Sequence, residues 1–429
     1  MKISIVGAGL AGLCAAHALV AAGATRVDVF DRAAGPGLET SFANGALLHP
    51  SAVDPWNSPG ITGTLIGSLF DADAAFRLHP RVLPSLWGWG WRFLRESRRD
   101  RYETHGLANL ALARLSVQRM AALRDEGIAY GCDRRGSLAP YRDAAGFAAA
   151  CTRAERLAGF GLEHRVLDRE AMLALEPALA AIAAQTVGAL HFPHDEQGDA
   201  HAFCNALAAR LAQQGVLFHW GTEVRALRTV GSAVRGLELA DGRRDDADRV
   251  VLAAAAWSAA LTRPLGLQLP LRPAKGYSIS FTLGSLADGS SPPNVPRMPI
   301  VDHDLHIAAV PVAGGRLRVA GTAELVGFDR RIDPRRTALL LRRLHRLYPA
   351  LVPLLDAAPR QDWTGLRPLS ADGVPLIGPT RIGGLWLNTG HGPIGWTTGV
   401  ASGELLADAI FGRRSAIDPT PFLPQRFGL

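Results

Sequence analysis

Residues 2–32 read KISIVGAGLAGLCAAHALVAAGATRVDVFDR, a lysine followed by a long run of apolar and small residues. Three interpretations of such a run are open. A basic residue before an apolar core is typical of an export signal, and an apolar stretch of about 20 residues can span a bilayer. The third interpretation is the opening of a buried nucleotide-binding fold. The positions of the glycines decide between them.

The glycines divide this stretch into a strand, a helix and a second strand. Residues 3–6 predict a short buried strand, residues 10–22 predict a helix that ends at Gly23, and residues 27–30 predict a second strand. A βαβ unit of about 30 residues has this order. Cleavage as a signal would remove the first strand of the unit, so we predict a dinucleotide-binding domain.

The loop between the first strand and the helix has the spacing G-x-G-x-x-G. Such glycines permit a tight turn, the close approach of a pyrophosphate to the backbone, and close packing of helix on strand, while free N–H groups at the helix N-terminus face the phosphates. Asp31 can accept hydrogen bonds from ribose hydroxyls and disfavours the 2′-phosphate of NADP. The candidate cofactor-binding residues of this unit are Gly7, Ala8, Gly9, Leu10, Ala11, Gly12, Asp31 and Arg32.

Further blocks follow along the whole chain. They are E-T-S-x-A-N (39–44), L-E-P (175–177), D-E-x-G-D (195–199), K-G-Y-S (275–278), A-E-L-V-G-F (323–328), W-T-G-L-R-P (363–368), D-G-x-P-x-I-G (372–378) and L-W-L-N-T-G-H-G-x-x-G-W-T (385–397). Taken in this order, the blocks resemble those of the FAD-dependent D-amino acid dehydrogenases. These enzymes belong to the D-amino acid oxidase superfamily of flavin amine oxidoreductases, so the resemblance implies FAD as the cofactor.

The expected fold class is α/β, with a Rossmann-like FAD-binding domain and a discontinuous α+β substrate domain built on an antiparallel sheet. Apolar and polar residues alternate between 265 and 362, as they do in an antiparallel sheet with one covered face. We expect the FAD-binding domain at 1–55, 196–264 and 363–429. The substrate domain is expected at 56–195, an α-rich insertion, and at 265–362.

The resemblance also assigns cofactor contacts outside the opening unit. Val224 matches a valine whose backbone contacts adenine, and Trp257 lies in a segment that usually carries a glycine where this chain has Ala255 or Ala256. A helix N-terminus after residue 394 is expected to face the flavin and favour its anionic reduced form. The remaining candidates are Thr40, Ser41, Asn44, Gly45, Ala46, Gly390, His391, Gly392, Ile394, Gly395, Trp396 and Thr397.

Three residues are candidates for contact with substrate. Arg367 matches the arginine that binds the substrate α-carboxylate in the family, and a planar guanidinium suits that task because it makes two parallel hydrogen bonds. Tyr277 is a candidate for the same carboxylate or for covering the ligand. His49 is a candidate for tuning the size or polarity of the substrate pocket. Lys275, one of only two lysines, is a candidate for the flavin edge.

The implied reaction is oxidative deamination of D-amino acids to 2-oxo acids and ammonia, with electrons passed to quinone or another non-oxygen acceptor. Alternatives are a dehydrogenase for a cyclic D-imino acid of the D-proline type, an amino acid oxidase that uses O₂, and a non-catalytic flavin-binding subunit. No metal ligand cluster is evident in the sequence. The four cysteines form no C-x-x-C pair, which favours a reducing, cytoplasmic location.

The net charge of +7 comes almost entirely from arginines that are scattered among acids, which argues against nucleic-acid binding. Residues 83–101, LPSLWGWGWRFLRESRRDR, place tryptophans beside arginines. Such a segment suits either an interfacial helix on the cytoplasmic face of the inner membrane or a buried helix with a charged outer face. We expect peripheral membrane contact at most.

Overall fold

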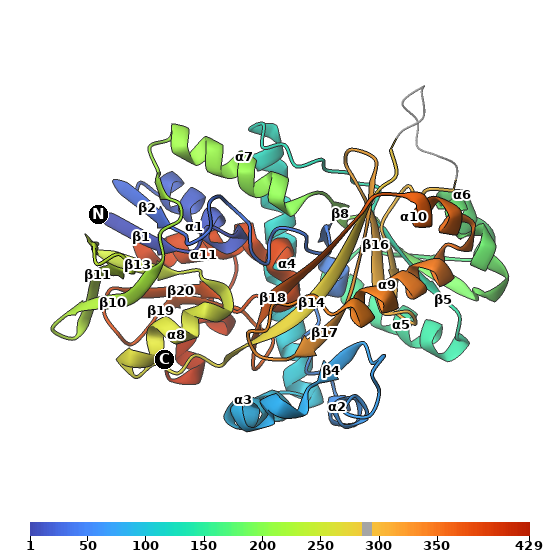
Figure 1. Ribbon diagram of the computed structural model, residues 1–429, viewed down its shortest axis with the longest axis horizontal. Helices are drawn as coiled ribbons and strands as arrows, with labels where there is room; N and C mark the ends of the chain where they lie inside the picture. Colours follow the sequence, from blue (N-terminus) through green and yellow to red (C-terminus); the bar gives the residue numbers. More distant parts are fainter. Residues whose placement is uncertain (285–293) are drawn as a thin grey trace.

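The computed structural model describes residues 1–284 and 294–429, and its core consists of two large sheets (Figure 1). The first sheet has six strands in the order β19-β20-β13-β1-β2-β9. All neighbours in it run parallel except β19 and β20. Its strands are β1 (Lys2–Val6), β2 (Arg26–Phe30), β9 (Leu217–His219), β13 (Arg249–Leu252), β19 (Leu376–Pro379) and β20 (Leu385–Thr389).

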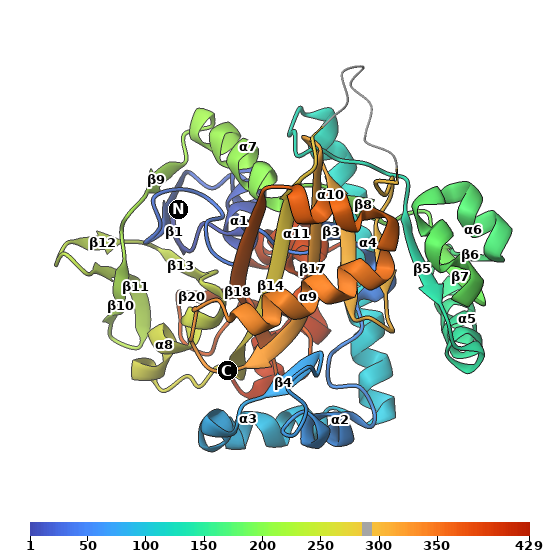
Figure 2. The same cartoon turned by 45° about the vertical axis from the view of Figure 1, so that its right-hand side comes forward.

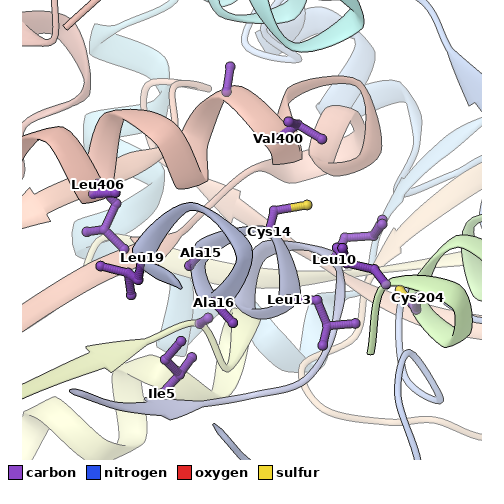
Figure 3. Packing of buried hydrophobic residues seen from close by; sticks show 14 of the residues in the cluster. Ile5, Leu10, Leu13, Cys14, Ala15, Ala16, Leu19, Cys204, Val400 and Leu406 are labelled. Carbon is purple, nitrogen blue, oxygen red and sulfur yellow. The ribbon is translucent and has the colours of Figure 1, made fainter. Parts of the chain in front are cut away.

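The opening stretch forms the predicted βαβ unit. Strand β1 lies at the centre of the sheet, between β2 and β13, and its residues 3–6 are buried. Helix α1 (Leu10–Ala21) carries only small and apolar residues apart from His17, and seven of its twelve residues are buried. It packs on the sheet through Leu13, Ala16 and Leu19 and on α11 (Gly395–Phe411) on its other side (Figure 3). The predicted Rossmann-like fold class is confirmed.

Helices α1 and α11 approach each other at the backbone. A Cβ added to Gly403 would lie 2.4 Å from the carbonyl oxygen of Cys14, so only glycine fits there. Two more helices complete this cover, α4 (Arg99–Asp125) against α11 and α7 (Ala200–Gln213) against α1. The side chains of Leu115, Met120 and Leu123 are buried on the inner side of α4.

The second sheet has nine strands. Its order is β18-β14-β17-β16-β15-β5-β7-β6, with β4 paired to β17. Helix α9 (Pro334–Leu347) lies across one face of β14 and β17, followed by α10 (Val352–Ala357), which matches the predicted sheet with one covered face (Figure 2). The strands are β4 (Phe76–Leu78), β5 (Ser137–Tyr141), β6 (Arg165–Leu167), β7 (Gly188–Phe192), β14 (Leu271–Thr282), β15 (Ile300–Asp302), β16 (Ile307–Val312), β17 (Arg316–Leu325) and β18 (Arg360–Ser370).

Strand β18 pairs along its whole length with β14, so residues 360–370 lie in the second sheet. The domain boundary expected from sequence, at residue 363, falls inside this strand. The division of the chain into two domains stays a prediction. The insertion at 56–195 contains strands β4 to β7 as well as helices. Besides α4, the helices of this insertion are α2 (Ile61–Gly67), α3 (Leu83–Arg95), α5 (Ala144–Ala158) and α6 (Arg169–Leu175). The short helix α8 (Ser258–Thr262) lies between β13 and β14.

Two small sheets flank the large ones. One consists of β10 (Val224–Val230), β11 (Ala233–Leu239) and β12 (Arg244–Asp246), and the other of β3 (Leu47–Leu48) and β8 (Glu196–Gln197). Helix α3 (Leu83–Arg95) lies beside α2 at one edge of the molecule in both views (Figures 1 and 2). Within residues 1–284 and 294–429, no helix has both the length and the apolar character needed to traverse a bilayer.

The contact between α1 and α11 gives a stability prediction. We expect Gly403→Ala to destabilise the protein by about 1–3 kcal/mol because the new Cβ meets rigid backbone. Gly399 lies on the same helix and serves as the control, since a Cβ there would meet the Cys14 Sγ at 3.6 Å, an ordinary contact. Thermal unfolding of both variants checks this. A Gly403→Ala melting temperature equal to or above that of Gly399→Ala would contradict the backbone clash.

Candidate active site

Three cavities adjoin one another in a row. We call them the nucleotide cleft, of about 450 Å³, the central cavity, of about 250 Å³, and the outer chamber, of about 700 Å³. The nucleotide cleft and the central cavity share the wall residues Gly9, Thr40, Ser41, Ala253 and Ala255. The central cavity and the outer chamber share Val301, Ala308, Ala320, Gly321 and Arg367. An extended ligand can therefore pass from one end of the row to the other.

The nucleotide cleft opens at the carboxyl ends of β1 and β2, as expected for a Rossmann-type sheet. The Asp31 carboxylate accepts hydrogen bonds from the backbone N–H of Ala8 at 2.7 Å and of Ala33 at 2.8 Å. These bonds fix its position at the edge of the glycine loop, while desolvation raises its pKa. The residue before α1 is Gly9, which has no side chain to cap the helix, and the Ser41 Oγ accepts from the backbone N–H of Leu10 at 3.2 Å. The other free N–H groups of that turn stay available to an anion.

The predicted glycines are required by the space around them. Gly7 has φ +108°, and a Cβ on it would lie 2.6 Å from the Ala253 carbonyl oxygen. A Cβ on Gly12 would lie 1.8 Å from the Gly7 carbonyl oxygen. The loop can therefore form only with glycine at these two positions, and it holds the backbone in the shape that suits a pyrophosphate.

The remaining predicted residues of the nucleotide cleft converge from other segments. The Arg32 guanidinium lies 4.3 Å from the centre of the Trp257 ring and donates to Glu39 at 2.7 Å. Val224, at the start of β10, lines the same cleft. The structure therefore brings together the residues that sequence predicted for the adenine end of the cofactor. Glu39, Thr222 and Ala253 also line the cleft and were not predicted individually.

Of the two positions predicted for the family's glycine, Ala255 and Ala256, Ala255 has the backbone conformation that favours glycine. It has φ +48°, in the left-handed region that costs a side-chain-bearing residue roughly 1–2 kcal/mol. Its carbonyl oxygen accepts a hydrogen bond from the Thr389 hydroxyl at 3.1 Å. Ala255 borders both the nucleotide cleft and the central cavity, so this chain keeps the glycine backbone conformation with an alanine.

The central cavity is lined by neutral polar groups that lack partners. Four buried atoms have no hydrogen-bond partner within residues 1–284 and 294–429, namely His49 Nδ1, Asn388 Oδ1, His391 Nε2 and Trp396 Nε1. Desolvation lowers the pKa of both histidines to about 4, so both are neutral at pH 7. Buried polar atoms without partners are costly. Donors and acceptors arranged around this cavity are suited to the polar edge of a flavin ring.

The segment after β20 supplies much of this cavity. Gly390 and Gly392 both have positive φ, +79° and +53°, and turn the chain into α11. No side chain caps the N-terminus of α11, and Gly395 and Trp396 of its first turn line the cavity. The Thr397 hydroxyl accepts from the backbone N–H of His49 at 3.1 Å, and this bond ties the segment just after β3 to α11. The predicted helix N-terminus thus faces the central cavity.

The other predicted cofactor residues divide into two groups. Leu10, Ala11, Asn44 and Gly45 line the central cavity. The second group, Ala8, Gly12, Ala46, Gly390, Ile394 and Thr397, shapes the backbone around the cavities without lining one. Ala46, at φ +57°, donates its backbone N–H to the Asn44 side chain at 3.0 Å. Contact of each of these residues with a cofactor stays a prediction.

Arg367 lies where the central cavity meets the outer chamber. It is half-buried, its Nη1 donates to the Thr322 carbonyl oxygen at 3.1 Å, and its Cζ lies 5.5 Å from the centre of the Trp56 ring. Within the part of the chain that the structure describes, no carboxylate is paired with it. Desolvation lowers its pKa to about 10, which leaves it charged at pH 7. A cation held this way is suited to an incoming carboxylate.

Two paired glycines leave space for large side chains, Gly276 for Arg367 and Gly365 for the Trp363 ring. Gly276 of β14 pairs with Gly365 of β18, and a Cβ on Gly276 would lie 2.2 Å from the Arg367 Nη1. Neither glycine was predicted as part of the site. Glycine inside a predicted strand is a signal of close approach to a ligand or another group, so K-G-Y-S and W-T-G-L-R-P could have revealed both.

The structure does not bring the Tyr277 hydroxyl or the Lys275 ammonium to Arg367. Tyr277 borders the central cavity, but its hydroxyl donates to Glu324 at 2.7 Å, and its ring packs in the core beneath α9. Lys275 is buried and donates to the Arg331 carbonyl oxygen at 3.0 Å. Both lie on the α9 side because side chains alternate along β14, whereas Gly276 between them faces Arg367.

A Rossmann-type cleft that adjoins a cavity lined by unpartnered polar groups is suited to an extended flavin nucleotide. At the far border of that cavity lies Arg367, which has no carboxylate partner among the described residues, and this arrangement indicates a flavin-dependent oxidoreductase. The model of the family described as DAO, FAD dependent oxidoreductase, matches residues 2–409. The chain is 42% identical to the D-amino acid dehydrogenase of Paramagnetospirillum magneticum over 97% of this chain and 96% of that protein. Its identity to the D-amino acid dehydrogenase of Sinorhizobium medicae is 39% over the full length of both.

Among solved structures, glycine oxidase from Geobacillus kaustophilus is similar, with a TM-score of 0.75 and 25% identity over 98% of both chains. The chain belongs to the DAO family of FAD-dependent oxidoreductases and, within it, to the D-amino acid dehydrogenases. FAD is its cofactor, and the glycine loop, Asp31 and the unpartnered groups of the central cavity are the residues that would hold it.

The charge of Arg367 gives a pH prediction. A guanidinium with a pKa near 10 is fully charged below that pH and loses its charge as the pH rises through it. We therefore expect a simple carboxylate ligand without an amino group, such as benzoate, to bind the holoenzyme with constant affinity from pH 7 to 9. Affinity then falls through pH 10. Titration of the flavin absorbance, with circular dichroism to verify folding, measures this; constant affinity up to pH 11 would contradict the assignment.

Proposed function

We propose that this protein catalyses the FAD-dependent oxidative deamination of D-amino acids to 2-oxo acids and ammonia. The observation that carries the proposal is Arg367, a cation without a carboxylate partner among the described residues, at the border of the central cavity. An α-amino acid anchored there by its carboxylate has its Cα within the central cavity. Identity of 39–42% to proteins named D-amino acid dehydrogenase supports the choice of substrate class.

The described residues contribute binding, orientation and electrostatics. When bound, FAD supplies the two-electron acceptor for the hydride from Cα. Arg367 holds the carboxylate through parallel N–H···O bonds and so fixes the orientation of Cα. The N-terminus of α11 favours negative charge at the edge of the central cavity. The imine product is hydrolysed by water to the 2-oxo acid and ammonia.

No protein base is available at the centre of the site. Within residues 1–284 and 294–429, the central cavity has no Asp, Glu or Lys in its lining, and its two histidines have pKa values of about 4. The substrate amine must therefore lose its proton before the oxidation step rather than to a side chain there. His49 and His391 act as neutral hydrogen-bonding groups.

Anaerobic mixing of the yellow holoenzyme with a panel of D- and L-amino acids, including D-proline, tests the proposal. We expect linear D-amino acids to bleach the flavin absorbance and to release ammonia. Bleaching by D-proline alone would favour the cyclic imino acid alternative, and fast reoxidation by O₂ would favour an oxidase. If no compound bleaches the flavin, the protein is a non-catalytic flavin-binding subunit and the proposal fails.

Removal of the carboxylate anchor gives a separate prediction. Arg367→Ala is expected to raise KM for the best D-amino acid by about two orders of magnitude, because a bidentate, charge-assisted pair is lost. FAD stays bound, since Arg367 is not part of the nucleotide cleft. Steady-state kinetics with an artificial dye and the flavin content of the purified variant measure both effects. An unchanged KM would remove Arg367 from the site.

We further propose that the electrons pass to a quinone at a membrane surface and that α2 and α3 dock there. Helix α3 has two apolar faces. Leu86, Trp89 and Phe93 are buried, whereas Leu83, Trp87, Trp91 and Leu94 point outward, with Trp87 85% exposed. Ile66 and Phe70, in and just after the neighbouring helix α2, are exposed as well. An amphipathic helix whose tryptophans lie beside arginines is suited to the lipid interface.

The charges around this surface favour an anionic membrane. Arg92 and Arg95 lie on α3, and the Arg95 guanidinium lies 5.5 Å from the centre of the Trp91 ring. Basic residues next to interfacial aromatics add electrostatic attraction to acidic headgroups. Gly88 and Gly90, which weaken a helix, lie on α3 without interrupting it.

Vesicle flotation tests the docking surface. We expect the wild-type holoenzyme to float with phosphatidylglycerol vesicles and much less with phosphatidylcholine vesicles. The double variant Trp87→Gln/Trp91→Gln is expected to lose most of its binding to phosphatidylglycerol vesicles. The control Phe160→Gln/Val230→Gln, which alters two apolar side chains exposed elsewhere on the surface, keeps it. A wild type that stays in solution with anionic vesicles would refute this docking surface.

A further inference from the structure

The outer chamber is reached through a neck of small side chains. Ala308 of β16 and Ala320 of β17 lie directly opposite each other in the second sheet, and both border the central cavity and the outer chamber. Gly321 follows, and a Cβ there would lie 2.6 Å from the His306 carbonyl oxygen. Small residues at these positions keep open the passage from the central cavity, where the substrate Cα is expected, to the outer chamber.

The chamber beyond the neck is large and has aromatic walls. Its volume of about 700 Å³ is in the range of pockets for drug-sized ligands. Trp56 and Phe76 pack edge to face with ring centres 5.5 Å apart, and Tyr141 stacks on His303 at 5.9 Å. Trp56 also lies beside Arg367, so the aromatic wall is next to the residue proposed to bind the carboxylate.

The charged groups of the chamber are already paired. Arg153 forms an ion pair with Asp54, and Asp302 accepts from Arg142 at 2.8 Å. Desolvation by the chamber walls lowers the pKa of His303, which keeps it neutral at pH 7. Among the described residues of the lining, only Arg367 lacks a counter-ion, and the substrate α-carboxylate takes that place. A charged substrate side chain would therefore find no partner.

We propose that the outer chamber receives the substrate side chain and selects D-amino acids with large aromatic side chains, such as D-phenylalanine, D-tyrosine and D-tryptophan. This inference rests on the proposed function. An aromatic side chain that passes the neck buries a large apolar area against Trp56 and Phe76. The methyl group of D-alanine reaches no farther than the neck and leaves the chamber to water.

Kinetics with the wild-type holoenzyme and a panel of D-amino acids give the first test. We expect kcat/KM for the aromatic substrates to exceed that for D-alanine, D-glutamate and D-lysine by about tenfold or more. An equal or higher value for D-alanine, D-glutamate or D-lysine would overturn the inference. This outcome leaves the proposed function intact, because a D-amino acid still reduces the flavin. Absence of reduction by every D-amino acid refutes the proposed function itself.

A second test closes the neck. Ala320→Leu is expected to lower the ratio of kcat/KM for D-phenylalanine to that for D-alanine by at least about tenfold, since the longer side chain enters the passage. The control Ala149→Leu makes the same change on the exposed side of α5 and keeps the wild-type ratio. Ala308→Leu makes the same change on the neighbouring strand β16, so misfolding of one variant leaves the other. A wild-type ratio in a folded, FAD-containing neck variant would overturn the inference.

Discussion

The close packing of α1 against α11 is the contact on which the cofactor site depends. It joins the N-terminal part of the chain to the C-terminal part at a backbone-to-backbone approach that only Gly403 permits. The N-terminal turn of each helix lines the central cavity, the first with Gly9 and Leu10 and the second with Gly395 and Trp396. The spacing between these two turns is therefore set by helix packing in the core. A flavin nucleotide that spans both turns depends on this packing for its alignment.

The site itself combines charge of one sign with neutral groups. Arg367 is the cation that the substrate carboxylate needs, and its surroundings offer only a carbonyl oxygen and an aromatic face. The histidines nearby are kept neutral by desolvation, so they neither repel the cation nor act as bases. Arg367 therefore binds the substrate carboxylate electrostatically, and the substrate amine loses its proton without help from these histidines. Such a site suits a reaction in which the cofactor supplies the chemistry.

The sequence predicted the cofactor half of the site far better than the substrate half. The glycine loop, Asp31 and the block after β20 are local patterns, in which neighbours in sequence are neighbours in space. Tyr277 shows the limit of such reasoning: its motif was recognised, but the face of β14 on which its hydroxyl lies depends on strand register and on α9. Trp56, Thr322 and the pair Ala308–Ala320 gave no signal, because their proximity arises only when four strands assemble. Gly276 and Gly365 did carry a signal, as glycines within predicted strands.

Among the connections between the two large sheets, the one after β18 is short. This strand carries Arg367, and only residues 371–375 separate it from β19, which continues through β20 into α11. The carboxylate anchor and the flavin-facing turn thus belong to one nearly unbroken segment, and no hinge between the two sheets can separate them widely. One inserted residue would displace the anchor by about 3.3 Å along the strand direction, which is a hydrogen-bond length. Related enzymes are therefore expected to vary in amino acid but not in length between these two strands.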